Sequence, residues 1–333
     1  MEHRILVVGD IHLVNQGSAP GYRTETYTDD LLKKLEETVN IAKEKEATCV
    51  LWLGDVFDHK APSKTNFALV NRVQDLLLSY GVVVYVLVGN HDLAAGGNLE
   101  SLQKQPIGSL RHIPNVVLLT EDHHDLDEDV TLYPVPGVPL GEDWAAYFNT
   151  ASRDSRTRKR RIVAAHQLIV PDVSAFPEKA RSSFYDAADV AMATDASLVL
   201  YGDVHSYHGF YVRDGVQGKV GLCNMGSICR MTVGDVDHTP RVMLLTIADD
   251  TRRSLGREEI VLQAVQPSEE VFRLEQKQAE KQHQQDIDDT IRQLKSTRVH
   301  KFSIETVVDE IRANSTADEA VRDTAVELIE LVR

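Results

Sequence analysis

Residues 85–97 read YVLVGNHDLAAGG, an apolar run that opens directly into Asn90, His91 and Asp92. A turn after a buried strand needs only one such polar residue, because a single Asn, Asp or Gly supplies the required backbone geometry. Three polar residues in a row at the end of a strand therefore indicate more than a connection. The apolar runs elsewhere in the chain predict the fold in which this stretch lies.

Short runs rich in Val, Ile and Leu recur through the first two thirds of the chain and predict buried strands. They cover residues 5–8, 49–53, 82–88, 115–119, 130–135, 161–165 and 197–201. Between the first three, residues 29–46 and 64–80 place apolar side chains on one helical face. This alternation is typical of parallel βαβ units, with a mixed sheet continuing through the later runs. Residues 209–265 are strand-rich with short turns, which predicts a second sheet packed against the first.

The composition changes after Pro267. Residues 269–295 are rich in Gln, Glu and Lys with a thin apolar stripe, which predicts an exposed helix. Two amphipathic segments follow, starting near Ser303 and Ser315, each opened by a good N-cap residue. We therefore predict a main α/β domain over residues 1–265 and a small helical module over residues 266–333.

The composition of the 333 residues, 42% hydrophobic and 26% charged, is ordinary for a globular protein. No apolar stretch approaches the roughly 18 residues of a membrane span, and the chain starts in a strand without the apolar region of a signal peptide. We expect a cytoplasmic protein, in the host cytoplasm if it comes from a bacteriophage. The three cysteines have no metal-like spacing, so we expect buried reduced thiols. The net charge of -15 argues against unaided tight binding to a polyanion, although clustered aspartates also suit divalent cations.

Polar side chains suited to cations follow five of the predicted strands. They are Asp10, His12, Asp55, Asp58, Asn90, His91, Asp92, His166, Asp203 and His205. Because ligands of α/β sheets collect beyond the carboxyl ends of strands, we expect these side chains to converge. Carboxylate, amide and imidazole donors without a thiolate suit Mn, Fe or Zn, and there are more of them than one ion needs. Two ions bridged by a carboxylate would use this set and promote attack on a phosphoester.

The series GDIH, GDVFD, GNHD, a single His after a strand and GDVH resembles the calcineurin-like metallophosphoesterase superfamily over roughly residues 5–230. Within that superfamily, the wording GDIHL, GDVFD and NMGSICR is most similar to the SbcD-type double-strand-break repair nucleases. The resemblance implies a two-sheet α/β/β/α sandwich of the metallophosphoesterase type, followed here by the small helical module.

The resemblance also implies roles for individual residues. One ion would bind Asp10, His12 and His205, Asp55 would bridge, and the second ion would bind Asn90, His166 and Asp203. His91 would protonate the leaving oxygen and Asp92 would orient its ring, while Asp58 either caps the following helix or places its carboxylate near the substrate. We expect two Mn²⁺ ions, with Mg²⁺, Fe²⁺ or Zn²⁺ as alternatives.

The last motif departs from the family pattern G-H-x-H, because Asp203 stands where the first His is usual. A carboxylate still binds Mn²⁺, but its negative charge reduces the Lewis acidity of the second ion. His208 is an alternative ligand whose spacing does not fit the pattern, so we favour Asp203.

The run SRDSRTRKRR at residues 152–161 holds the densest positive charge of the chain. Its cations are Arg153, Arg156, Arg158, Lys159, Arg160 and Arg161. It is either a solvated loop before a strand or a contact to the DNA phosphate backbone beside the cleft.

The resemblance implies a Mn-dependent DNA exonuclease or endonuclease, the nuclease subunit of an SbcCD-like repair and recombination complex. Its partners would be DNA and an SbcC-type SMC-like ATPase, docked by the helices after Pro267, and a homodimer stays open. Two other functions stay open as well: a phosphodiesterase or phosphatase acting on small molecules at the same two-ion site, and a weakly catalytic scaffold for the ATPase.

Overall fold

The computed structural model of the protein describes residues 2–59, 64–94, 97–153, 160–248, 255–296, 304–313 and 316–331. The chain forms two compact units, the first ending at Phe272 and the second starting at Arg273. The first unit thus extends beyond the predicted boundary at residue 265. The reason is that Val271, at the end of α7 (Ser268–Val271), and Phe272 are buried in it.

The first sheet of the first unit has six strands in the order β14-β13-β1-β2-β3-β4. Their bounds are β1 (His3–Val8), β2 (Cys49–Trp52), β3 (Val83–Leu87), β4 (Val116–Leu119), β13 (Arg241–Ile247) and β14 (Leu255–Val261). Strands β1 to β4 are parallel, and β13 pairs antiparallel with β1 and with β14. Helices α1 (Tyr27–Glu44) and α2 (Phe67–Ser79) make the parallel connections, and the side chain of Asn66 caps α2.

The second sheet has the order β11-β12-β10-β7-β6-β5. Its strands are β5 (His124–Asp125), β6 (Val130–Val135), β7 (Arg160–His166), β10 (Leu198–Gly202), β11 (Gly209–Gly215) and β12 (Gly218–Asn224). The predicted division of strands between the sheets is therefore wrong. Residues 130–202 form the centre of the second sheet, and residues 241–261 return to the first, because β13 pairs with β1 across more than two hundred residues.

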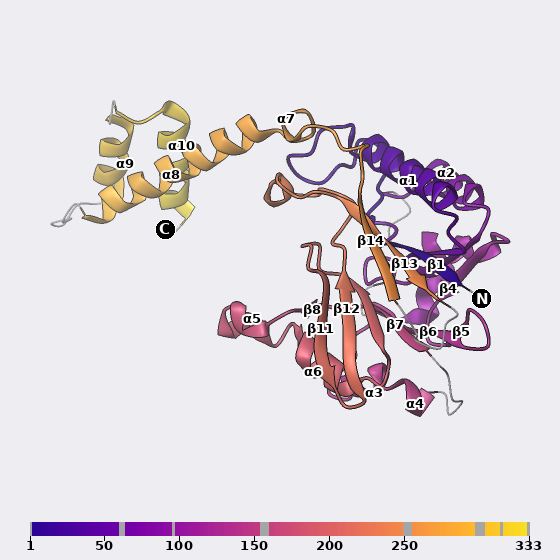
Figure 1. Ribbon diagram of the computed structural model, residues 1–333. Coiled ribbons are helices and arrows are strands. Elements are labelled where there is room, and N and C mark those ends of the chain that lie inside the picture. The colour runs from indigo at the N-terminus through magenta and orange to yellow at the C-terminus, as the bar shows by residue number, and fades with distance from the viewer. Residues whose placement is uncertain are drawn as a thin grey trace. The chain divides into compact units, whose positions relative to one another are not determined.

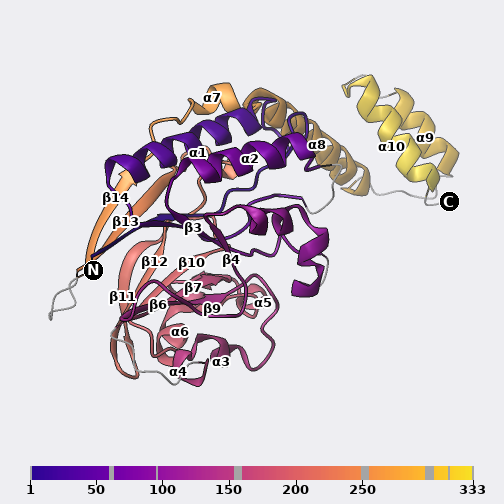
Figure 2. The ribbon, with the colours of Figure 1, turned by 90° about the vertical axis from the view of Figure 1, so that its right-hand side faces the viewer.

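Shorter elements complete the first unit. They are α3 (Trp144–Phe148), α4 (Thr150–Arg153), α5 (Glu178–Arg181), α6 (Ala187–Ala193), the 3₁₀ turns Leu99–Lys104, Pro106–His112, Val173–Ala175 and Val233–Asp235, and the pair β8 (Ile169–Val170) and β9 (Tyr185–Asp186). As Figures 1 and 2 show, α1 and α2 lie over the first sheet, and α3 and α6 lie beyond the second.

Three layers of buried side chains separate these elements, because successive strand residues point to opposite faces. In β1, Leu6 and Val8 face α1 and α2, while Ile5 and Val7 face the second sheet. A third layer, which includes Tyr133 and Phe148, lies between the second sheet and its helices. The predicted α/β/β/α sandwich is confirmed, and it brings the carboxyl ends of strands from both sheets together.

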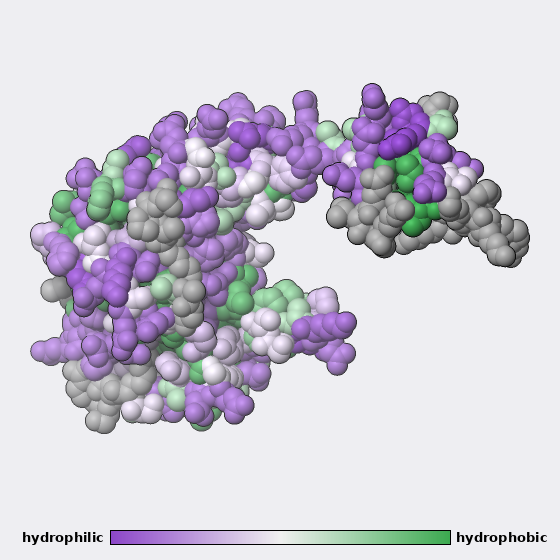
Figure 3. All heavy atoms as spheres, turned by 180° about the vertical axis from the view of Figure 1, so that it is seen from behind, coloured by the Kyte–Doolittle hydropathy of each residue, from purple (hydrophilic) through white to green (hydrophobic). Residues whose placement is uncertain are grey.

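The second unit consists of α8 (Leu274–Ser296), α9 (Ile304–Ala313) and α10 (Glu319–Leu331). A small apolar cluster of Val308, Ile311, Ala325 and Val326 holds α9 against α10. Hydrophobic side chains also reach its surface, visible as a green stripe among hydrophilic residues in Figure 3, and Ile304 and Leu328 are 44% and 46% exposed. Among the described residues, no helix has the length and apolar character needed to cross a membrane.

Candidate metal centre

The predicted ligands lie at the carboxyl ends of five strands, β1, β2 and β3 in the first sheet and β7 and β10 in the second. His12, Asp55 and Asp203 have positive φ angles of 56°, 47° and 80°. Such angles are uncommon for residues other than glycine and concentrate at functional sites. The backbone is therefore bent sharply at three of these strand ends, which turns the side chains inward.

Two glycines make room for these side chains. A Cβ atom on Gly89 would come within 2.1 Å of Asp55 Oδ1, and one on Gly54 within 2.3 Å of His166 Nδ1. Gly54 also has a φ angle of 112°, which a residue with a side chain rarely adopts. The glycines in GDVFD and GNHD are thus required by close packing around the carboxylate of Asp55.

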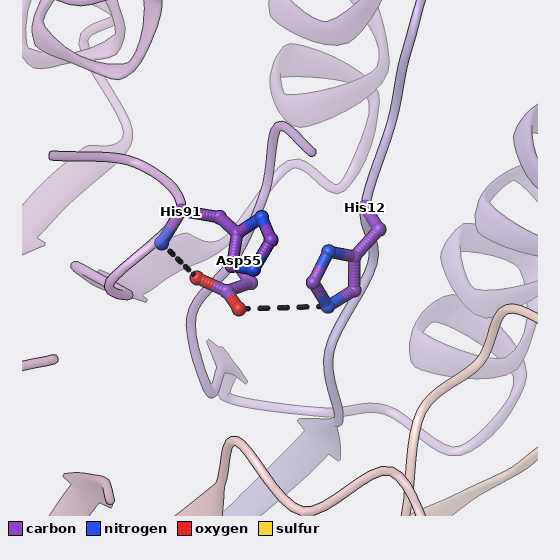
Figure 4. A group of neighbouring side chains, drawn as sticks. All are labelled: His12, Asp55 and His91. Carbon is purple, nitrogen blue, oxygen red and sulfur yellow. Dashed lines mark hydrogen bonds and ion pairs between the residues drawn. The ribbon is translucent and has the colours of Figure 1, made fainter. Parts of the chain in front are cut away.

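The carboxylate of Asp55 lies between two groups of potential ligands. One group is His12, Asp55 and His91, and the other is Asp10, Asp55 and His166; within each group the ligand atoms lie within 4.8 Å of one another. Asp55 Oδ2 is 3.5 Å from His12 Nε2 and 3.2 Å from His166 Nε2, while Oδ1 accepts a hydrogen bond of 2.8 Å from the His91 amide (Figure 4). A carboxylate in this position is suited to bridge two cations.

The donor atoms themselves fit divalent cations. Asp10 Oδ2 and His166 Nε2 are buried and have no hydrogen-bond partner among the described residues. His166 Nδ1 donates to the Leu53 carbonyl at 2.7 Å, so Nε2 is the ring atom that can bind a cation once its proton is lost. His12 Nε2 lies 2.9 Å from His205 Nε2, so two further imidazole nitrogens face each other. Buried lone pairs arranged in this way are costly unless a cation binds between them.

Charge and burial act together on this cluster. Burial opposes the charged form of Asp55, but His166 and His12 hold the pKa of its carboxyl below the usual range. Burial opposes the charged form of His166 too, yet Asp55 and Asp10 raise its pKa well above the ordinary value. Burial lowers the pKa of His205 and so favours the neutral imidazole that a metal requires.

Asp203 lies beside His166 and Asp10. Its Oδ1 is 3.7 Å from His166 Nε2, and its amide donates to Asp10 Oδ1 at 3.0 Å. Burial raises the pKa of Asp203 to about 6, with Asp10 and Asp55 adding to the effect. His208 instead pairs its Nδ1 with the Tyr201 hydroxyl at 2.9 Å, so the geometry favours Asp203 over His208 as a ligand.

The prediction that Asp92 orients His91 is wrong. The Asp92 carboxylate accepts hydrogen bonds from the amides of Val56, Phe57 and Gly89 at 3.2, 3.1 and 3.0 Å. No ion pair joins it to His91 within the part of the chain that the structure describes. Asp92 therefore holds the loop that carries Asp55, and another residue positions the His91 ring.

That residue is Asp58, for which the sequence left two roles open. His91 Nδ1 lies 2.8 Å from the Asp58 carbonyl oxygen and 3.5 Å from its Oδ1, and the same Oδ1 is 3.3 Å from His12 Nδ1. The hydrogen bond to Asp58 raises the pKa of His91 to about 9. The second Asp of GDVFD was the sequence signal for this role, but nothing local connects it to His91.

Asn90 and His91 form the exposed side of the cluster. Asn90 is exposed at the end of β3, and the His91 side chain is 43% exposed, whereas Asp10, His12 and His166 are buried. The backbone of Gly137 approaches Asn90 so closely that a Cβ on Gly137 would lie 2.2 Å from the Asn90 amide nitrogen. A ligand can therefore reach the cluster from the side of Asn90 and His91.

The basic run does not border this cluster where it is described. Arg156, Arg158, Lys159 and the side chain of Arg153 lie outside the described residues. Arg160 is buried, and Arg161 forms an ion pair with Asp195. Both begin β7, whose other end carries His166, and a strand of seven residues is about 20 Å long. Arg160 and Arg161 thus lie at the end of β7 away from the ligands, and a DNA contact by the basic run stays a prediction.

Comparison with known proteins adds to this geometry. The sequence model of the calcineurin-like phosphoesterase family matches residues 3–207. The DNA double-strand break repair protein Mre11 of Methanosarcina mazei is 26% identical over 217 residues, which cover 62% of this chain and 31% of that protein. The chain thus spans less than a third of the length of this relative.

Solved structures with a similar arrangement have low sequence identity. The protein TT1561 of Thermus thermophilus is 13% identical with a TM-score of 0.48, covering 78% of this chain and 99% of that one. A dimetal phosphatase from Danio rerio is 11% identical with a TM-score of 0.44, at the same coverage.

Replacing the shared carboxylate tests the two-ion geometry. We expect the wild type to bind two Mn²⁺ per chain and Asp55→Asn to lose affinity at both sites by more than about 100-fold, because removal even of an outer partner of a metal ligand costs about 10 to 100-fold. Isothermal titration calorimetry measures both steps. Asp75→Asn, an exposed change on α2, is the matched control and should bind like the wild type. Loss of a single ion in Asp55→Asn would contradict a bridging role.

Metal binding should depend on pH. The raised pKa of His166 means that the metal-free protein keeps a second proton on this ring, at Nε2, near neutral pH, and an ion must displace that proton. Affinity for Mn²⁺ should therefore rise from pH 6 to pH 8, by up to about tenfold per pH unit for each proton released. Calorimetry in buffers of different ionisation enthalpy counts these protons. A flat affinity over this range would exclude proton competition.

Proposed function

This chain belongs to the calcineurin-like phosphoesterase family, and from that premise we propose that it is a Mn²⁺-dependent DNA nuclease subunit that cleaves phosphodiesters in DNA repair and recombination. The observation that carries the proposal is the position of the Asp55 carboxylate between His12 on one side and Asp10 and His166 on the other. When bound, two divalent cations would act as Lewis acids on the phosphate and lower the pKa of the attacking water. Asp10, His12, Asp55, Asn90, His166, Asp203 and His205 would hold them.

In this proposal His91 supplies the proton for the leaving oxygen. Its Nδ1 is committed to Asp58, so Nε2 is the atom that turns toward the substrate. With a pKa raised to about 9, the ring carries a proton on both nitrogens near neutral pH, as a general acid requires. Asp58 acts through His91 as a positioning residue, and Asp92 keeps the Asp55 loop in place.

Two observations favour a DNA substrate over a small molecule. The relative from Methanosarcina mazei is a DNA double-strand break repair protein. The exposed position of Asn90 and His91 also leaves the cluster accessible to a polymer. A small diester would more often be enclosed, since pockets for small ligands bury most of the ligand surface.

We further propose that the helical second unit docks an SbcC-type SMC-like ATPase. Its small cluster, centred on Val308 and Ile311, buries only part of its apolar residues, and Ile304 and Leu328 are left at the surface. An amphipathic helix pair with an exposed apolar stripe is suited to bind a coiled coil by helix packing. This part of the proposal is independent of the metal chemistry.

The nuclease proposal is tested with His91→Asn on end-labelled duplex DNA in Mn²⁺. We expect cleavage to fall by about 10² to 10⁴-fold, the usual contribution of a general acid, while two Mn²⁺ still bind. The exposed change His112→Ala is the matched control and should cut like the wild type. Reactions run with and without the purified ATPase. If a small nucleotide diester is hydrolysed but DNA is never cut in either setting, the nuclease proposal is wrong.

Docking is tested by co-purification with the ATPase. The double substitution Ile304→Lys with Leu328→Lys should abolish the complex, because it replaces two exposed apolar side chains of this unit with charges. Glu305→Lys with Glu310→Lys places the same two lysines at exposed polar positions of α9, with a larger change in net charge, and should leave the complex intact. Hydrolysis of a small diester by the free chain should not change in either variant. Binding by the first double variant would show that the ATPase docks elsewhere.

A further inference from the structure

A row of arginine and aromatic side chains joins the open edges of the two sheets. It consists of Tyr207, Phe210, Arg241 and Arg257, together with Glu259, and is called the edge seam below. Tyr207 and Phe210 come from the second sheet side, just before and within β11, whereas Arg241 begins β13 and Arg257 lies in β14. Figure 2 shows β11, β12, β13 and β14 on the same side of the first unit.

The contacts of the edge seam cross from one sheet to the other. The guanidinium carbon of Arg241 lies 4.1 Å from the ring centroid of Tyr207, and that of Arg257 lies 4.3 Å from the ring centroid of Phe210. The Tyr207 hydroxyl donates to Glu259 at 2.6 Å, and Arg241 pairs with the same carboxylate at 3.6 Å. These contacts hold the Tyr207 ring in one orientation while 36% of its surface stays exposed.

The edge seam starts at the candidate metal centre. Tyr207 follows His205 by two residues, so their Cα atoms are at most about 7 Å apart. Strand β13 is antiparallel to β1, and therefore Arg241 lies at the end of the sheet where β1 leads into Asp10. Strand β14 is antiparallel to β13 and runs back toward that end, with Val261 opposite Arg241. Arg257 pairs with Leu245, so it lies on the sheet edge nearer the middle of the sheet.

The edge seam has more positive than negative side chains, whereas the whole protein has a net charge of -15. Glu259 is occupied by Tyr207 and Arg241, whereas Arg257 is exposed and, within the described ranges, takes part in no ion pair. The edge seam thus offers two guanidinium groups against one carboxylate. A positioned ring flanked by arginines is the combination by which proteins grip single-stranded nucleic acid, through base stacking and phosphate contacts.

We propose that the edge seam holds the single nucleic-acid strand that flanks the phosphodiester at the metal centre. The exposed part of the Tyr207 ring stacks on a base, Arg257 contacts a phosphate, and Arg241 fixes the ring from beneath and adds a second positive charge. This inference rests on the proposed nuclease function and gives it a substrate path. It places the strand on a path from Tyr207 and Arg241 at the site end toward Arg257 on the edge of β14, and not at the start of β7.

The test measures binding of a labelled single-stranded oligonucleotide at several salt concentrations. Tyr207→Ala should weaken binding by about tenfold, as expected for loss of one stacked base, and Tyr207→Phe should retain most of the affinity. Arg257→Ala should weaken binding and reduce the slope of log affinity against log salt by about 0.7, the value for one phosphate contact. Lys219→Ala, which removes an exposed cation at the far end of β12, is the matched control and should bind like the wild type.

Hydrolysis of a small diester, the p-nitrophenyl ester of thymidine 5′-monophosphate, is followed in parallel. For Tyr207→Ala and Arg257→Ala the loss in kcat/KM on DNA should exceed the loss on this diester by at least about tenfold. Equal losses on both substrates would mean that these residues support the metal centre, which overturns the proposal. If the wild type cleaves DNA and both variants bind DNA as tightly as the wild type does, the edge-seam proposal is overturned and the nuclease proposal stands. A wild type that hydrolyses the diester but neither binds nor cuts DNA overturns the nuclease function as well.

Discussion

The arrangement depends on one buried carboxylate, that of Asp55. Its side chain is about 1% exposed, and a charge so buried is unstable unless it is paired and hydrogen-bonded. Here His12 and His166 approach one oxygen, the His91 amide donates to the other, and the pKa of Asp55 stays low in spite of burial. The strand ends around Asp55 must therefore keep their positions, because a shift of one of them would leave the Asp55 charge without a partner.

Backbone geometry makes room for the buried Asp55 carboxylate and holds it in place. Gly89 and Gly54 let the backbone approach the Asp55 carboxylate and His166, respectively. The Asp92 carboxylate accepts hydrogen bonds from three amides in two loops next to Asp55. Burial and the nearby Asp55 raise the pKa of Asp92 to about 7. The protonation state of the Asp92 carboxyl is therefore coupled to the three hydrogen bonds that hold these loops. These residues thereby hold the Asp55 carboxylate between His12 and His166.

The arginines of the edge seam are not those of the densest basic run in the sequence. The densest basic run leads into β7 at the end away from the ligands, with Arg160 buried and Arg161 tied to Asp195. Arg241 and Arg257, which are distant in the sequence from Tyr207 and Phe210, pack on these two rings where the sheet edges meet.

The sequence by itself determined the strands, the α/β/β/α class and the set of side chains that gather at the strand ends, because apolar periodicity and residue type are local properties. It did not determine which strand belongs to which sheet, that Asp58 and not Asp92 positions His91, or that the first unit extends to Phe272. Only the tertiary structure decided these points. Each is a contact between segments far apart in the chain, such as β1 with β13, and no local pattern encodes the register that creates it.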